Sequence, residues 1–146
     1  MKIVLKEIDL RGTITYVNSK FCEISGYSRE ELLGSNHRML HSGVHDKAYF
    51  KAMYRVIARG EIWHGEICNR RKDGSAYWVD TTIVPHLSGR GKVDSYTAIR
   101  FDVSDHVRAL KALEVAQDEA RRAAQVLPAA RQQRLFAFLP VQPFLH

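Results

Sequence analysis

No long apolar segment occurs in this sequence of 146 residues. A helix needs about 18 or more consecutive apolar residues to cross a bilayer, and every apolar run here is shorter. Residues 1–12 include acidic side chains and no small-residue cleavage site, which is unlike a secretory signal. We therefore expect a cytoplasmic protein with no membrane segment.

Cysteine is also scarce. Cys22 and Cys68 are too few for a disulfide framework, and they fall in segments that we predict as helix and buried strand, so we expect reduced core thiols. His37, His41 and His45 lie four residues apart, but a serine–glycine pair interrupts any helix there and no CxxC motif accompanies them. We expect no metal site.

Acidic residues are absent between Ala120 and His146, where arginines are frequent. The net charge of +6 is therefore partly an effect of this tail, and we do not expect nucleic-acid binding. Enzyme signatures are missing as well. No GxGxxG follows a predicted strand, and no Ser-His-Asp or paired-carboxylate arrangement is legible, so we predict a binding module without enzymatic activity.

The apolar fraction of 45% suffices for one core. Alternating and β-branched residues predict a hairpin at 3–17, a hairpin from 62 to Pro85 and a strand at 93–103. Asn18, Ser28 and Asp46 are capping residues, and each predicts a helix that follows it. The fold class is α+β, with one antiparallel sheet and small helices on one face.

A different element follows this domain, which we assign to residues 1–103. The stretch 104–127 predicts a helix, and a weak seam of apolar residues favours a paired coiled coil over a helix packed on its own domain. Residues 128–146 are rich in Pro, Ala and Arg, and we expect them to be poorly ordered.

Four strings resemble the PAS family in order and spacing: NSKF at 18–21, SGYSREELLG at 25–34, NRRKDGSAYW at 69–78 and DVSD at 102–105. The resemblance covers residues 4–106. It implies a five-stranded antiparallel sheet whose concave face and flanking helices enclose a ligand pocket, followed by a C-terminal signalling helix.

Within that family the string from Trp63 to Gly74 is similar to the flavin-binding redox sensors of the aerotaxis-receptor, nitrogen-fixation-regulator and methane-monooxygenase-sensor type. The resemblance implies FAD as cofactor, with Trp63 and Asn69 in contact with it. An indole suits the planar ring, and an amide suits the donors and acceptors of its edge. The alternatives are a core tryptophan at position 63 and, at position 69, an asparagine of a turn or strand edge.

The string GSNHRMLH at 34–41 is similar to the light-oxygen-voltage motif, in which cysteine stands at the place of His37. An imidazole cannot form that thiol adduct, so the resemblance implies a redox pocket. It places Asn36, His37, Arg38 and Leu40 beside the cofactor, with Arg38 at a phosphate. His37 is either a group that exchanges a proton with the flavin or a surface or helix-end histidine.

Two rival interpretations remain open. One is a haem-binding PAS oxygen sensor, although no histidine lies between Tyr49 and Arg59. The other is a cofactor-free dimerisation module. FMN in place of FAD is also open.

In the sensor interpretation, a redox signal passes through Asp102, Ser104 and Asp105 to the C-terminal helix. We expect a homodimer formed through the PAS domain and this helix, with an output domain that lies outside these residues.

Overall fold

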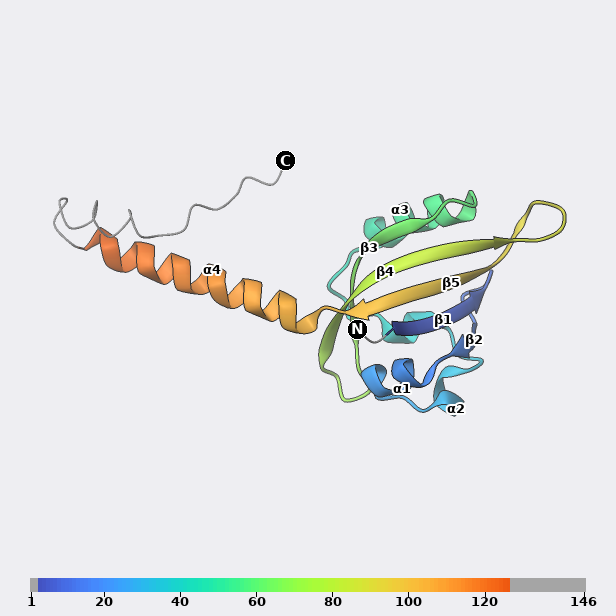
Figure 1. The fold of residues 1–146 in the computed structure, drawn as a ribbon, viewed down its shortest axis with the longest axis horizontal. Coiled ribbons are helices and arrows are strands. Elements are labelled where there is room, and N and C mark those ends of the chain that lie inside the picture. Colours follow the sequence, from blue (N-terminus) through green and yellow to red (C-terminus); the bar gives the residue numbers. More distant parts are fainter. Residues whose placement is uncertain (1–2, 127–146) are drawn as a thin grey trace. The chain divides into compact units, whose positions relative to one another are not determined.

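The computed structural model describes residues 3–126, and the chain divides into two units at residues 104 and 105. The first unit is one antiparallel sheet with helices on its concave face (Figure 1). Its elements are β1 (Ile3–Asp9), β2 (Ile14–Val17), α1 (Ser19–Ser25), α2 (Arg29–Leu32), the 3-10 helix η1 (His37–Leu40), α3 (Lys47–Ala58), β3 (Trp63–Arg70), β4 (Ala76–Leu87) and β5 (Val93–Asp102).

The five strands follow the order β2-β1-β5-β4-β3, and every neighbouring pair is antiparallel. The first and last strands of the domain therefore lie side by side. This order, with its helices inserted between β2 and β3, confirms the predicted α+β architecture.

The helix starts are fixed by local capping. Asn18 accepts a hydrogen bond from the backbone N–H of Phe21, and Asp46 accepts one from that of Tyr49. Ser28 and Glu31 form a reciprocal capping box at the start of α2. These three predicted caps are confirmed.

One predicted boundary is wrong. The strand expected to end at Pro85 continues to Leu87. The pairing of β3 with β4 stops at Ile83, so beyond that residue β4 is paired only with β5 in the described sheet. A proline, which has no N–H to donate, is tolerated on such an unpaired edge.

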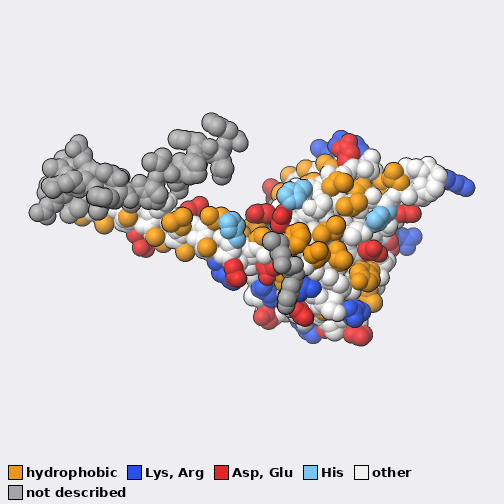
Figure 2. All heavy atoms as spheres, in the orientation of Figure 1, with side chains coloured by type: hydrophobic (Ala, Val, Ile, Leu, Met, Phe, Trp, Pro, Cys, Tyr) orange, Lys and Arg blue, Asp and Glu red, His pale blue; other side chains and the backbone are white. Residues whose placement is uncertain are grey.

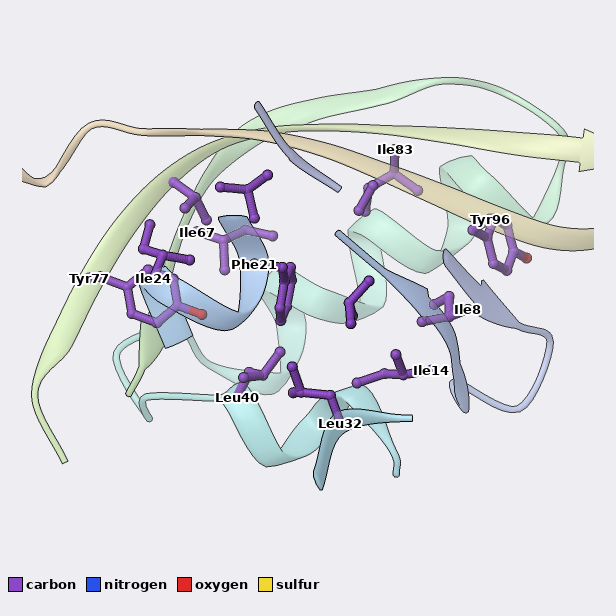
Figure 3. Packing of buried hydrophobic residues seen from close by; sticks show 14 of the residues in the cluster. Ile8, Ile14, Phe21, Ile24, Leu32, Leu40, Ile67, Tyr77, Ile83 and Tyr96 are labelled. Atoms are coloured by element: carbon purple, nitrogen blue, oxygen red, sulfur yellow. The ribbon is translucent and has the colours of Figure 1, made fainter. Parts of the chain in front are cut away.

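The core lies between the sheet and the helices (Figure 3). Phe21, Leu32 and Leu40 approach it from the helical side, and Ile67 and Tyr77 from the strands. In β1 the buried positions are Val4, Lys6 and Ile8, whereas Ile3 is exposed and Leu5 is only partly buried. A lysine therefore lies among inward-facing residues.

The second unit is described to residue 126 and consists of α4 (Ser104–Gln125), which also includes the last residue of the first unit. The helix begins where the sequence predicts it, and Leu110 and Leu113 are about half exposed. The expectation of poor order at 128–146 lies outside the described residues.

On the face of the first unit shown in Figure 2, basic and acidic side chains are interspersed among hydrophobic ones. None of the described helices is both long and apolar enough to cross a membrane.

Candidate functional site: a cationic cavity in the sheet

A cavity lies between the inner face of the sheet and the helices η1 and α3. Its volume is about 20 Å³, room for about one water molecule. Apolar side chains make most of its wall, and polar ones come chiefly from the strands. The lining residues are Lys6, Ile8, His37, Leu40, His41, Phe50, Met53, Tyr54, Ile57, Ile67, Asn69, Ile83, Tyr96, Ala98 and Arg100.

Buried polar atoms without a protein partner gather at this cavity. They are the Nδ2 atom of Asn69 and the Nε and Nη1 atoms of Arg100, together with the neighbouring hydroxyl of Tyr77. Asn69 and Tyr77 lie opposite each other on β3 and β4. Leaving such groups unpaired costs about 1–3 kcal/mol each. The wall is therefore suited to a ligand that offers hydrogen-bond acceptors.

Tyr77, which lies opposite the lining residue Asn69, is kept protonated. Burial raises the pKa of Tyr77, while the positive charge of Arg100 and the nearby Asn69 side chain oppose the rise. The phenol is therefore neutral and available as a hydrogen-bond donor.

Two cations face the same space. Lys6 is 2% exposed and Arg100 is 5% exposed, and the cavity-lining residues in the described part of the chain include no Asp or Glu. Burial and the positive charge of Arg100 lower the pKa of Lys6 well below its ordinary value. The cavity is thus electropositive, because Arg100 keeps its charge even where Lys6 is neutral.

His37 and Tyr54 both line the cavity and contact each other. The Nε2 atom of His37 lies 2.5 Å from the Tyr54 hydroxyl, and the backbone N–H of His37 donates to the carbonyl of Gly12 over 2.9 Å. A Cβ atom on Gly12 would lie 2.7 Å from Cδ2 of the ring. The glycine therefore makes room for the buried imidazole.

The surroundings of His37 disfavour its protonation. Burial, followed by the positive charges of Lys6 and Arg100, lowers the pKa of His37 to about 2. The ring is neutral at neutral pH. It is a buried residue at the start of η1 rather than a surface histidine, and its exchange of a proton with a flavin remains a prediction.

The other residues of the 34–41 string have different positions. Leu40 is buried in the cavity wall. Arg38 is exposed and lines a surface groove with Lys47 and Lys51. Asn36 caps η1, because its Oδ1 accepts from the N–H of Arg38 and its Nδ2 donates to the carbonyl of Arg11. The described contacts of Asn36 are thus those of a capping residue.

Trp63 lies on the inner face of β3 without lining the cavity. Its indole packs edge-on to Tyr49, with ring centroids 5.9 Å apart, and covers Gly65, where a Cβ would come within 2.6 Å of it. The predicted flavin contact of Trp63 therefore remains a prediction.

The chain matches the PAS domain family model over residues 2–105. This chain belongs to the PAS domain family. It is 37% identical over 102 residues to the aerotaxis receptor of Escherichia coli (strain K12), covering 70% of this chain and 20% of the receptor. It is 33% identical over 102 residues to the nitrogen fixation regulatory protein of Klebsiella pneumoniae, covering 70% and 21%. The chain thus spans about a fifth of the length of these curated relatives.

The solved structures include a light-oxygen-voltage domain studied with a flavin analogue. That domain matches this PAS domain with a TM-score of 0.62 and 29% identity, over 78% of this chain and 86% of the other. The resemblance read from the sequence is confirmed.

The junction at the end of the PAS domain is tied to β4. The Oγ atom of Ser104 accepts from the N–H of Trp78 over 2.8 Å, and its own N–H donates to Oδ1 of Asp102 over 3.0 Å. Ser104 is buried, whereas Asp105 is exposed and pairs with Arg108 within α4.

Sequence reasoning did not assign Lys6, Tyr54 or Arg100 to the pocket of the PAS domain, although all three line the cavity. Lys6 lies two residues after Val4 and two before Ile8, and this alternation was the one sequence signal that Lys6 faces the core.

Cys22 and Cys68 are both free, as expected, and neither lines the cavity within the described residues. No group of three or more His, Cys, Asp or Glu side chains suited to a metal occurs in the described range. The His45 ring instead accepts a hydrogen bond from the N–H of Cys68.

Proposed function

We propose that this PAS domain is a sensory module that binds FAD in the cavity and responds to its redox state. The observation that carries the proposal is the set of buried, unpaired polar atoms on Asn69, Tyr77 and Arg100 at a cavity with otherwise mainly apolar walls. A flavin offers a planar apolar ring and an edge of acceptors and donors that such a wall would match.

The ring needs more room than the cavity now has. The cavity-lining side chains of η1 and α3 include Leu40, Phe50, Met53 and Tyr54. Binding therefore requires these flexible side chains to adopt other rotamers, with the sheet unchanged.

A groove on the surface supports a ligand with a phosphate arm. Arg38, Lys47 and Lys51 bring three cations to it, and Phe50 and Tyr54 line both the groove and the cavity. A ring held inside could thus continue into a diphosphate outside, since guanidinium and ammonium groups bind phosphate oxygens. This supports FAD or FMN over riboflavin.

The pocket suits redox chemistry better than light-driven adduct formation. His37 stands at the place of the light sensors' cysteine, and the cavity-lining residues in the described part of the chain include no thiol. When bound, the flavin would supply reversible electron transfer. The chain's own residues would then bind and orient the ring and would catalyse no reaction.

The signal would leave the pocket through β5. Arg100 faces the cavity, and Asp102 at the end of the same strand accepts the N–H of Ser104, the first residue of α4. A change in what Arg100 binds could therefore shift the start of the helix, provided that the helix has two arrangements.

We also propose that the chain works as a homodimer, with an output domain elsewhere in its protein. Leu110 and Leu113, two apolar residues of the stretch 104–127, are about half exposed on α4. Sedimentation that finds only monomer at high concentration would contradict this pairing.

An absorption spectrum of protein purified without refolding tests the cofactor. We expect the two-banded spectrum of oxidised flavin, and chromatography of the released cofactor then separates FAD from FMN. Asn69→Leu should lose the flavin and stay folded, because it removes an unpaired buried donor. Arg70→Leu, on the exposed side of β3, is the matched control.

A Soret band would replace flavin with haem. A spectrum without visible bands would favour the cofactor-free dimerisation module, for which the small volume of the cavity is the supporting observation.

A further inference from the structure

Lys6 and Arg100 occupy neighbouring positions on the inner face of the sheet. Lys6 of β1 pairs with Ala98 of β5, and Val4 pairs with Arg100. The two cations are therefore diagonal neighbours across the strand pair, roughly 7–8 Å apart, with their Cβ atoms somewhat closer. Two long side chains at that separation can reach one common ligand atom or group.

Every titratable group that faces Lys6 across the cavity is a cation, an imidazole or a phenol. These groups are Arg100 and Tyr96 of β5, His37 of η1, His41 after it, and Tyr54 of α3. None can supply the negative charge that two buried cations need. Burial also lowers the pKa of His41, so that ring is not a counter-ion either.

The two cations differ in how they can respond. A guanidinium stays protonated in proteins, whereas a buried lysine releases its proton readily. Burial and Arg100 lower the pKa of Lys6 well below its ordinary value. Lys6 is therefore the group that can become neutral beside Arg100 and regain its proton when negative charge arrives.

Arg100 has unused donors for such a charge. Its Nε and Nη1 atoms are buried without a partner, and a guanidinium binds an anion most strongly through two parallel N–H groups. Its side chain also lies over the ring of Phe21 at 6.0 Å, which holds it from the helical side.

We propose that Lys6 and Arg100 form an anion receptor, which holds a flavin more tightly when reduction has made its ring negative than when the ring is neutral. The inference rests on the flavin binding proposed above. A low-potential electron donor supplies two electrons, solvent supplies one proton to N5 of the ring and one to the amine of Lys6, and the ring keeps one negative charge.

The first test measures the binding of oxidised and dithionite-reduced FAD to wild type and to Lys6→Met, which keeps the length of the side chain and removes its charge. We expect the reduced-to-oxidised affinity ratio to fall at least tenfold in the variant. For two electrons this equals a fall of about 30 mV in midpoint potential. Arg100→Gln should lower the ratio as well.

Lys92→Met, in the exposed turn between β4 and β5, is the control and should leave the ratio unchanged. A ratio in Lys6→Met equal to that of wild type overturns the receptor. If wild type binds no FAD at all, the proposed function fails, and the second test decides the receptor alone.

The second test needs no flavin. It compares the binding of 2-naphthoate with that of its neutral analogue 2-naphthamide by nuclear magnetic resonance titration. We expect wild type to bind the carboxylate at least tenfold more tightly, and we expect Lys6→Met and Arg100→Gln to lose this preference. Equal affinity for the two probes in wild type, or no binding of the carboxylate, overturns the receptor, whether or not FAD binds.

Discussion

The Nε2 atom of His37 and the hydroxyl oxygen of Tyr54 are 2.5 Å apart, so a hydrogen bond joins η1 to α3 beside the cavity. Burial lowers the pKa of His37 to about 2 and raises the pKa of Tyr54. Both groups are therefore neutral at neutral pH. The bond therefore fixes the ring of the histidine beside the cavity.

Tyr54→Phe removes this bond while it keeps the aromatic ring. It leaves a buried imidazole nitrogen without its partner, which costs about 1–3 kcal/mol of unfolding free energy. Urea denaturation followed by circular dichroism measures the loss. Tyr16→Phe, whose ring is 47% exposed on β2, is the control and should change stability little. Equal effects of the two variants would contradict the bond.

Gly12→Ala should destabilise the domain more than Gly34→Ala. Both glycines have positive φ, +82° and +83°, so each alanine carries the same backbone strain of about 1–2 kcal/mol. Only at Gly12 would the new Cβ collide with the His37 ring, whereas nothing lies within 4 Å of the Cβ at Gly34. The excess for Gly12→Ala should be about 1–3 kcal/mol. Equal unfolding free energies would show that the His37 ring moves aside at little cost.

The stability of the domain should fall in acid because of His37. Its pKa is about 2 in the folded chain and about 6.5 in the unfolded chain. Between these values the unfolded state binds the extra proton, so stability falls with decreasing pH by up to about 1.4 kcal/mol per unit. His37→Gln should remove this slope between pH 6 and pH 4. A difference between variant and wild type that does not change with pH would contradict the neutral, buried ring.

Local chemistry made much of the fold predictable. Asn18, Ser28 and Asp46 bond to backbone N–H groups three residues away, and such a signal is complete within one short stretch of sequence. The end of β4 was not predictable in the same way. Whether a strand tolerates Pro85 depends on whether β3 still pairs with it, which only the assembled sheet decides.

The site was predictable only in part. Asn69 and His37 were recognised through the family resemblance, and both line the cavity. Lys6 was not, because β1 carries apolar residues at both parities, Ile3 and Leu5 as well as Val4 and Ile8. Contact with the helices decides which of the two faces of β1 is buried. From the sequence alone, a lysine in such a strand is expected to point into solvent.

Gly65→Ala should displace the Trp63 indole, since a Cβ there would lie 2.6 Å from the ring. The emission of Trp63, measured in a Trp78→Phe background, should shift relative to the same background with Gly65. Gly89→Ala is the matched control, because nothing lies within 4 Å of that Cβ and neither glycine has positive φ. If Trp63 contacts the flavin as predicted, Gly65→Ala should also lower flavin retention. Unchanged emission would place the indole elsewhere.

Ser104→Ala should loosen the junction between β4 and α4. It removes the acceptor of the Trp78 N–H, a bond of 2.8 Å, at a cost of about 1–2 kcal/mol. Hydrogen exchange should therefore become faster at the amide of Trp78 and at the first amides of α4. Ser95→Ala is the control, because its hydroxyl contacts the neighbouring Asp94 on an exposed stretch of β5. If the Trp78 amide exchanges at the wild-type rate, the hydroxyl of Ser104 does not hold the junction to β4.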